Sequence, residues 1–76
     1  MKPCTKAIYT LMLSRWTEGK SVTSNELLHR FMTVDYRSRI SEIRTHLREA
    51  GTMLRVESKR IPGQRTNEYR LVQADV

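Results

Sequence analysis

The stretch "DYRSRISEIRTHLREAG", from Asp35 to Gly51, has the strongest helical pattern in the chain. Its apolar side chains recur at intervals of four, three, four and three residues, which places them on one face of a helix. These residues are Tyr36, Ile40, Ile43, Leu47 and Ala50. Asp35 is the expected cap at the start of the helix, and Gly51 stands where a left-handed residue would end it.

A first helix is predicted near the N-terminus, from Thr5 to about Thr17. Apolar residues recur there at three- and four-residue spacing, which predicts one buried stripe that includes Trp16. The stripe consists of Ile8, Leu11, Met12 and Trp16. A large indole on such a stripe is typical of core packing. Gly19 ends this helix.

A second, short helix is predicted between these two. Ser21 and Val22 predict a short strand, and the segment 23–26 (TSNE) then matches a capping box. In a capping box the Thr23 hydroxyl accepts from the amide of Glu26 and the Glu26 carboxylate reaches back. The helix that follows carries Leu27, Leu28 and Phe31 inward and ends at about Phe31 or Met32.

After Gly51 the period of the pattern changes from about 3.6 to 2, which is typical of strands. Leu54 and Val56 face one way, whereas the charged residues between them face the other. The segment 62–67 (PGQRTN) supplies turn residues. The alternation then resumes over 68–72 with Tyr69 and Leu71 inward, so the sequence predicts a hairpin with a basic tip.

Length and charge limit the choice of architecture and partner. The 76 residues are enough for one domain, predicted to span 1–76 with an ordered core at about 5–72. A formal net charge of +6 favours phosphate-rich partners. Cys4 is the only cysteine, so an intramolecular disulfide is excluded and a reducing cytoplasm is expected.

The sequence does not predict a membrane segment or a signal peptide. The longest apolar run, Ala7 to Leu13, is much shorter than the ~20 residues that a membrane span needs. It is followed by bulky Trp16 rather than by the small residues of a cleavage site. We therefore expect no membrane association and a cytoplasmic location.

The order of predicted elements, an α+β arrangement of three helices followed by a two-stranded antiparallel β-hairpin, resembles the winged helix-turn-helix superfamily from Thr5 to Val72. The segment "SRISEIRTHLREAG" followed by a hairpin looks like the small winged-helix proteins of phages and prophages. In those proteins an R-I-x-x-L/I-R-x-x-L-x-x-x-G pattern marks the third helix and its exit. The resemblance implies that the third helix enters the major groove of DNA and that the hairpin, or wing, lies along the backbone or in the minor groove.

The resemblance also implies a set of DNA-binding residues on the third helix and on or near the wing. Arg44 is left out of this set because it sits closer to the flank of the apolar stripe. Positive charge is in excess on both elements, and guanidinium groups match guanine edges and phosphate oxygens. The implied residues are Arg37, Ser38, Arg39, Ser41, Glu42, Thr45, Arg48, Lys59, Arg60, Arg65 and Asn67.

The predicted function is sequence-specific or structure-specific binding of double-stranded DNA, as a phage or prophage regulator or as an accessory in recombination or replication. A different interpretation is a solvated helix whose charges pair along its surface, as Arg39 and Glu42 can at a spacing of three. A third is a protein-interaction adaptor for a host or phage protein, with an exposed apolar patch of Met32, Val34 and Met53. The pattern shows no dimer seam, so the oligomeric state is left open.

Enzymatic chemistry is not predicted. His29 and His46 lie far apart in the chain on different predicted helices, and Cys4 is near the chain end. Paired carboxylates, a glycine-rich phosphate loop and a His-x-x-x-His spacing are missing from the sequence. We therefore expect no catalytic residues, no metal ligands and no cofactor.

Overall fold

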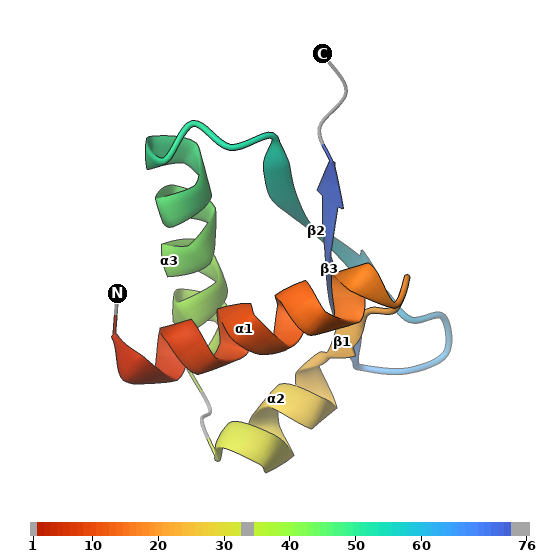
Figure 1. Cartoon of the computed structure of the whole chain (residues 1–76). Helices are drawn as coiled ribbons and strands as arrows, with labels where there is room; N and C mark the ends of the chain where they lie inside the picture. The colour runs from red at the N-terminus through yellow and green to blue at the C-terminus, as the bar shows by residue number, and fades with distance from the viewer. Residues whose placement is uncertain (1, 33–34, 74–76) are drawn as a thin grey trace.

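The computed structural model describes residues 2–32 and 35–73 and has an α+β architecture (Figure 1). Three helices and three strands follow one another in the predicted order. They are α1 (Pro3–Thr17), β1 (Val22–Thr23), α2 (Ser24–Phe31), α3 (Tyr36–Glu49), β2 (Leu54–Arg60) and β3 (Asn67–Gln73).

The strands form an antiparallel sheet with the order β1-β3-β2. The strands β2 and β3 form the predicted hairpin, and β1, the short strand predicted near Ser21 and Val22, adds a third strand at the edge of β3. This strand lies one residue later than predicted, at Val22–Thr23 rather than Ser21–Val22. The reason is its register: Val22 pairs with Tyr69 and Thr23 with Glu68.

The core lies where α1 and α3 pack against the sheet. Figure 1 shows α1 crossing in front of α3 and β3, and α3 contacts β2. Of the five residues predicted on the inward stripe of this helix, Ile40, Ile43 and Leu47 are buried, whereas Tyr36 is half-buried and Ala50, at the helix end, is exposed. Tyr69 and Leu71 on β3 are buried as predicted. The helical and strand periods therefore predicted correctly which faces of α3 and β3 are buried.

The helix ends follow the predicted signals in part. The Thr23 hydroxyl accepts from the backbone amide of Glu26 at 3.1 Å, which confirms the first half of the capping box. The Glu26 carboxylate does not reach back, because it pairs with Arg15 of α1. The Asp35 side chain makes no capping hydrogen bond to α3. Gly51 has φ +68° at the exit of α3, the left-handed conformation that was predicted.

Trp16 is not a core residue, which corrects the prediction. Its exposed fraction is 39%, whereas Ile8 and Met12 on the same helix are buried. The reason is geometric: each four-residue step along a helix turns about 40° past a full circle. After two such steps from Ile8, position 16 has turned from the centre of the buried face to its edge, where Trp16 lines a surface hollow beside β3.

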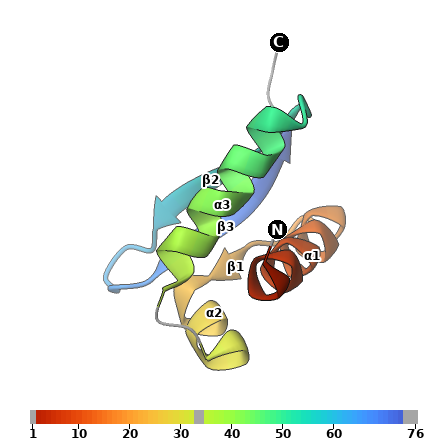
Figure 2. The same cartoon turned by 90° about the vertical axis from the view of Figure 1, so that its left-hand side faces the viewer.

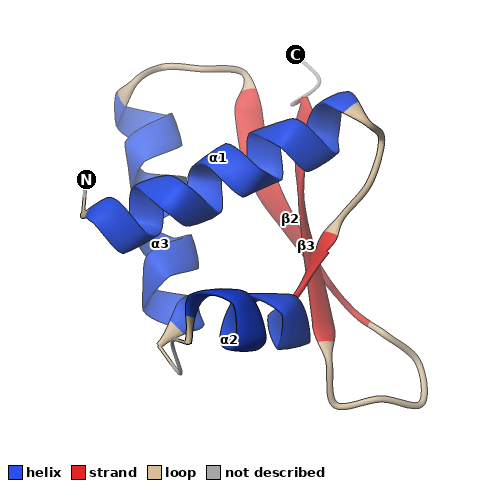
Figure 3. Cartoon of the chain, turned by 60° about the horizontal axis from the view of Figure 1, so that its bottom comes forward, coloured by secondary structure: helices blue, strands red, loops and turns tan. Residues whose placement is uncertain are grey.

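The hairpin is attached to α2 where β3 begins, next to the connection between the two strands. The Ser24 hydroxyl accepts a hydrogen bond of 3.1 Å from the backbone amide of Asn67. The side-chain amide of Asn25 donates to the Thr66 hydroxyl at 3.2 Å. The connection between β2 and β3 has the predicted length but lies one residue earlier, at 61–66 rather than 62–67. Figures 1 and 3 show this connection and α3 on opposite sides of the molecule.

Within the described residues, the helices are too short or too polar to meet the requirements of a membrane span.

Candidate nucleic-acid interface

The two flanks of α3 differ in charge. One turn of a helix takes 3.6 residues, so Arg37, Arg44 and Arg48, spaced by seven and four, fall on one side. We call these residues the β2-facing flank, since Arg44 and Arg48 line a groove with β2. The α1-facing flank consists of Arg39, Glu42, His46 and Glu49, of which all but Arg39 line a hollow beside α1. Figure 2 shows α3 in front of the hairpin, with α1 to its right.

The α1-facing flank is electrically compensated. The Arg39 Nη2 atom lies 3.5 Å from the Asp35 carboxylate and 3.2 Å from that of Glu42. Only 15% of the Arg39 side chain is exposed, and its Nε is buried without a hydrogen-bond partner among the described residues. Arg39 and Glu42 were both predicted to face the DNA groove. Glu42 turns toward α1 instead, and Arg39 pairs with Asp35 and Glu42 along α3, because the helical period carries both positions around to the other flank.

Glu42 is also bound from α1. Its Oε2 accepts a hydrogen bond of 2.5 Å from the Thr5 hydroxyl, and Lys2 Nζ lies 3.8 Å from Oε1. The Thr5 hydrogen bond is the largest of the causes that lower the pKa of Glu42 below its ordinary value, and partial burial opposes it. The positive charges of Arg39 and Lys2 lower this pKa further. The carboxylate is thus held in its charged form as part of the contact between α1 and α3.

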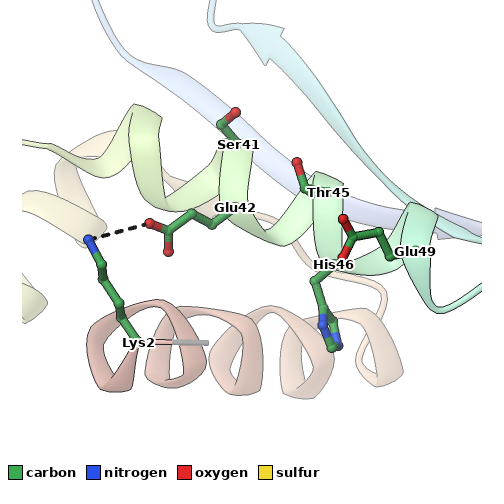
Figure 4. A pocket seen from close by; sticks show the side chains of 6 residues that line it. All are labelled: Lys2, Ser41, Glu42, Thr45, His46 and Glu49. Carbon is green, nitrogen blue, oxygen red and sulfur yellow. Dashed lines mark ion pairs between the residues drawn. The ribbon is translucent and has the colours of Figure 1, made fainter.

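A hollow of about 550 Å³ lies between the N-terminal end of α1 and α3. Figure 4 shows that Glu42 points toward Lys2, whereas Ser41 and Thr45 point away from α1. His46 packs edge-on against Tyr9 instead, with ring centroids 5.8 Å apart. The side chains therefore do not converge on one reacting atom, and Ser41 and Thr45 remain on the outer surface of α3.

Candidate metal ligands do not gather either: over 2–32 and 35–73, histidine, cysteine and carboxylate side chains form no group of three or more that could hold an ion.

The β2-facing flank is exposed and lacks acidic partners. Arg37, Arg44 and Arg48 are all exposed, and in the described part of the chain none of them forms an ion pair. Arg44 makes one long hydrogen bond, 3.5 Å from Nη2 to the Val56 carbonyl. Arg55 of β2 lines the same groove.

Two functional candidates were missed by sequence reasoning. Arg44 was set aside for its closeness to the apolar stripe, and Arg55 was treated as an ordinary outward-facing strand residue. The spacing of Arg37, Arg44 and Arg48 was a usable signal, because it defines a single helix flank. Arg55 carried no comparable signal, since its nearness to α3 depends on how the hairpin packs.

The predicted residues on and near the hairpin tip are separate from α3. Lys59, Arg60 and Arg65 are exposed, and no ion pair among the described residues involves them. Gly63 has φ +76°, which permits the tight connection between the two strands. Asn67 is half-buried, because its backbone is bound to Ser24 at the start of β3.

The predicted site residues therefore divide into three groups. Arg37, Ser38, Ser41, Thr45 and Arg48 lie exposed on α3, and Lys59, Arg60 and Arg65 lie exposed near the hairpin tip. The remaining group, turned toward other elements, is Arg39, Glu42 and Asn67. No protein-family model matches the chain, and no similar protein was found among curated proteins or solved structures.

Proposed function

We propose that this chain binds double-stranded DNA as a winged helix-turn-helix domain, with α3 in the major groove and the hairpin as the wing. The observation that supports this most strongly is the β2-facing flank, where Arg37, Arg44 and Arg48 are exposed and lack carboxylate partners within the described chain. A solvated helix that balances its own charges would be expected to pair these residues as it pairs Arg39.

The residue types on α3 suit a major groove. The groove of B-form DNA is about 12 Å wide and accepts a helix, and arginine can bind guanine O6 and N7 with two hydrogen bonds. Ser41 and Thr45 are short and exposed, so they allow close approach to base edges. We assign Arg37 and Ser41 to base contacts, and Arg44 and Arg48 to phosphates. Arg39 is removed from the predicted DNA-binding residues, because it is largely buried and paired.

The hairpin tip supplies contacts at a distance from α3. Lys59 and Arg60 end β2, and Arg65 lies in the 61–66 connection, which is on the side of the molecule opposite α3 (Figures 1 and 3). Their role in the proposal is to bind phosphates further along the duplex. Such contacts add affinity and fix orientation without reading the sequence.

The adaptor alternative is less well supported. Met32 is 89% exposed and Met53 45% exposed. They lie beyond opposite ends of α3, so they do not form the expected patch. Val34, the third residue of that patch, lies outside the described residues.

The proposal is tested by measuring affinity for a short randomised duplex by fluorescence anisotropy across a salt series. The logarithm of affinity should fall linearly with the logarithm of salt concentration, by about 0.9 per phosphate contact. Lys6→Gln is the matched control, since Lys6 is exposed on α1 and makes no ion pair with described residues. A flat salt response, or an equal loss from Lys6→Gln and Arg48→Gln, would overturn the proposal.

A further inference from the structure

The groove between α3 and β2 has an apolar floor and a basic rim. Its volume is about 450 Å³, and more of its lining is carbon than polar atoms. Leu47, Leu54 and Val56 supply the apolar side chains. Around them stand Arg44 and Arg48 from α3 and Arg55 from β2, all exposed and without an ion pair in the described part of the chain.

The groove runs along an open strand edge. Because the strand order is β1-β3-β2, β2 has a strand neighbour on one side only within the described residues. The Val56 carbonyl points to the open side, where it accepts the long bond from Arg44. In an antiparallel pair every second residue directs its backbone groups outward, so Leu54 and Ser58 do so together with Val56.

We propose that this groove binds an acidic, extended segment of a partner protein that carries apolar side chains at alternate positions. The segment adds to the edge of β2 by backbone hydrogen bonds, as in other cases of strand addition. Its apolar side chains cover Leu54 and Val56, and its carboxylates pair with Arg44, Arg48 and Arg55.

A protein segment fits this groove better than a nucleic acid. A phosphate backbone would use the three arginines and could accept hydrogen bonds from the open amides of β2, but it offers no donor for the open carbonyls and no partner for the apolar floor. An acidic peptide with apolar side chains offers partners for the three arginines, for the apolar floor and for the backbone groups at the edge of β2. Arg44 and Arg48 belong also to the proposed DNA surface, so the peptide and DNA would compete. The peptide site itself is argued from the groove alone and stands even where the chain fails to bind DNA.

The test uses the intact chain and a capped synthetic peptide, EDELEVEDE, in which the leucine and valine fall on one side of a strand. Binding is followed by NMR at near-physiological salt. The largest shifts are expected at the backbone amides of Leu54, Val56 and Ser58. Arg44→Gln combined with Arg48→Gln should weaken binding about tenfold. Arg60→Gln combined with Arg65→Gln removes the same charge at the hairpin tip and should leave the affinity within about twofold.

Two altered peptides separate the contributions. Replacement of both apolar residues by serine should weaken binding about tenfold, and N-methylation of the backbone on the side facing β2 should do the same. Equal binding of the serine peptide, equal losses from the two double variants, or no binding of EDELEVEDE would each overturn the proposal. So would a short DNA duplex that shifts the Leu54 and Val56 amides more than the peptide does.

Discussion

The two flanks of α3 contain the same kind of side chain in opposite circumstances. Arg39, on the α1-facing flank, is largely buried and paired with Asp35 and Glu42. Arg48, on the β2-facing flank, is exposed and has no carboxylate partner in the described part of the chain. The first arginine therefore belongs to the packing of α3 on α1, and the second is available to a partner. A count of arginines in the helix cannot make this distinction, whereas the identity of the neighbouring element can.

The largest effect is expected when the β2-facing flank is neutralised. Replacing Arg37, Arg44 and Arg48 together by glutamine should lower affinity for duplex DNA at least about a hundredfold, since each arginine contact contributes roughly 1–3 kcal/mol. The salt slope should fall by up to about 0.9 per arginine that contacts phosphate. Anisotropy titrations measure the affinity and the salt slope. If this variant kept its affinity for DNA, the β2-facing flank would not be a DNA-binding surface.

A smaller loss is expected from the hairpin tip. Arg60→Gln combined with Arg65→Gln should lower affinity about tenfold and reduce the salt slope by about 0.9 for each residue. Discrimination among DNA sequences should not change, because phosphate contacts do not read bases. A selection from randomised duplexes with this variant checks the second point. A changed consensus sequence would mean that the tip reads bases.

The opposite pattern is expected from the α1-facing flank. Arg39→Gln should lower the free energy of unfolding by about 1 kcal/mol, because it removes a largely buried guanidinium group from its partly exposed partners Asp35 and Glu42. Its effect on DNA affinity should stay below about threefold, as expected for a residue that does not touch the partner. Urea denaturation and anisotropy measure the two effects on one sample. A large loss of affinity without a loss of stability would reassign Arg39 to the interface.

The smallest expected effect is on the acid stability of this flank. The folded-state pKa of Glu42 lies below its ordinary value of 4.5, so its contribution to stability is complete above about pH 4.5 and is lost as the pH falls toward the folded pKa. Thr5→Val should raise the pKa of Glu42, because the Thr5 hydrogen bond is the largest cause of its lowering. Lys2→Gln should raise it less.

NMR titration of the Glu42 carboxyl measures its pKa directly in the wild-type chain and in the two variants. A greater shift in Lys2→Gln than in Thr5→Val would show that charge rather than hydrogen bonding governs this group.

The sequence predicted the helices and the strand pairing well where a short local pattern determines them. The apolar spacing of Ile40, Ile43 and Leu47 and the left-handed Gly51 depend on neighbours along the chain. Burial of Trp16 was predicted wrongly, because a stripe read at fixed spacing ignores the rotation that accumulates along a helix.

The candidate site was less predictable than the fold. Whether Arg39 or Arg44 faces a partner depends on which flank packs on α1, and α1 is distant in sequence. Thr5, which binds Glu42 from 37 positions away, gave no sign of this role in the sequence. Tertiary contacts of this kind decide the electrostatics of α3, so composition and periodicity alone assign its surface incompletely.

The attachment of the start of β3 to α2 has a consequence for the length of DNA that the protein covers. Ser24 and Asn25 bind the chain at Asn67 and Thr66, which fixes where the hairpin leaves the body of the molecule. In the proposed complex, the distance between α3 and the hairpin tip is then the same for every DNA target. The number of base pairs protected from nuclease should be the same for every target sequence. Lengthening the 61–66 connection should extend this footprint on one side only and leave the bases read by α3 unchanged.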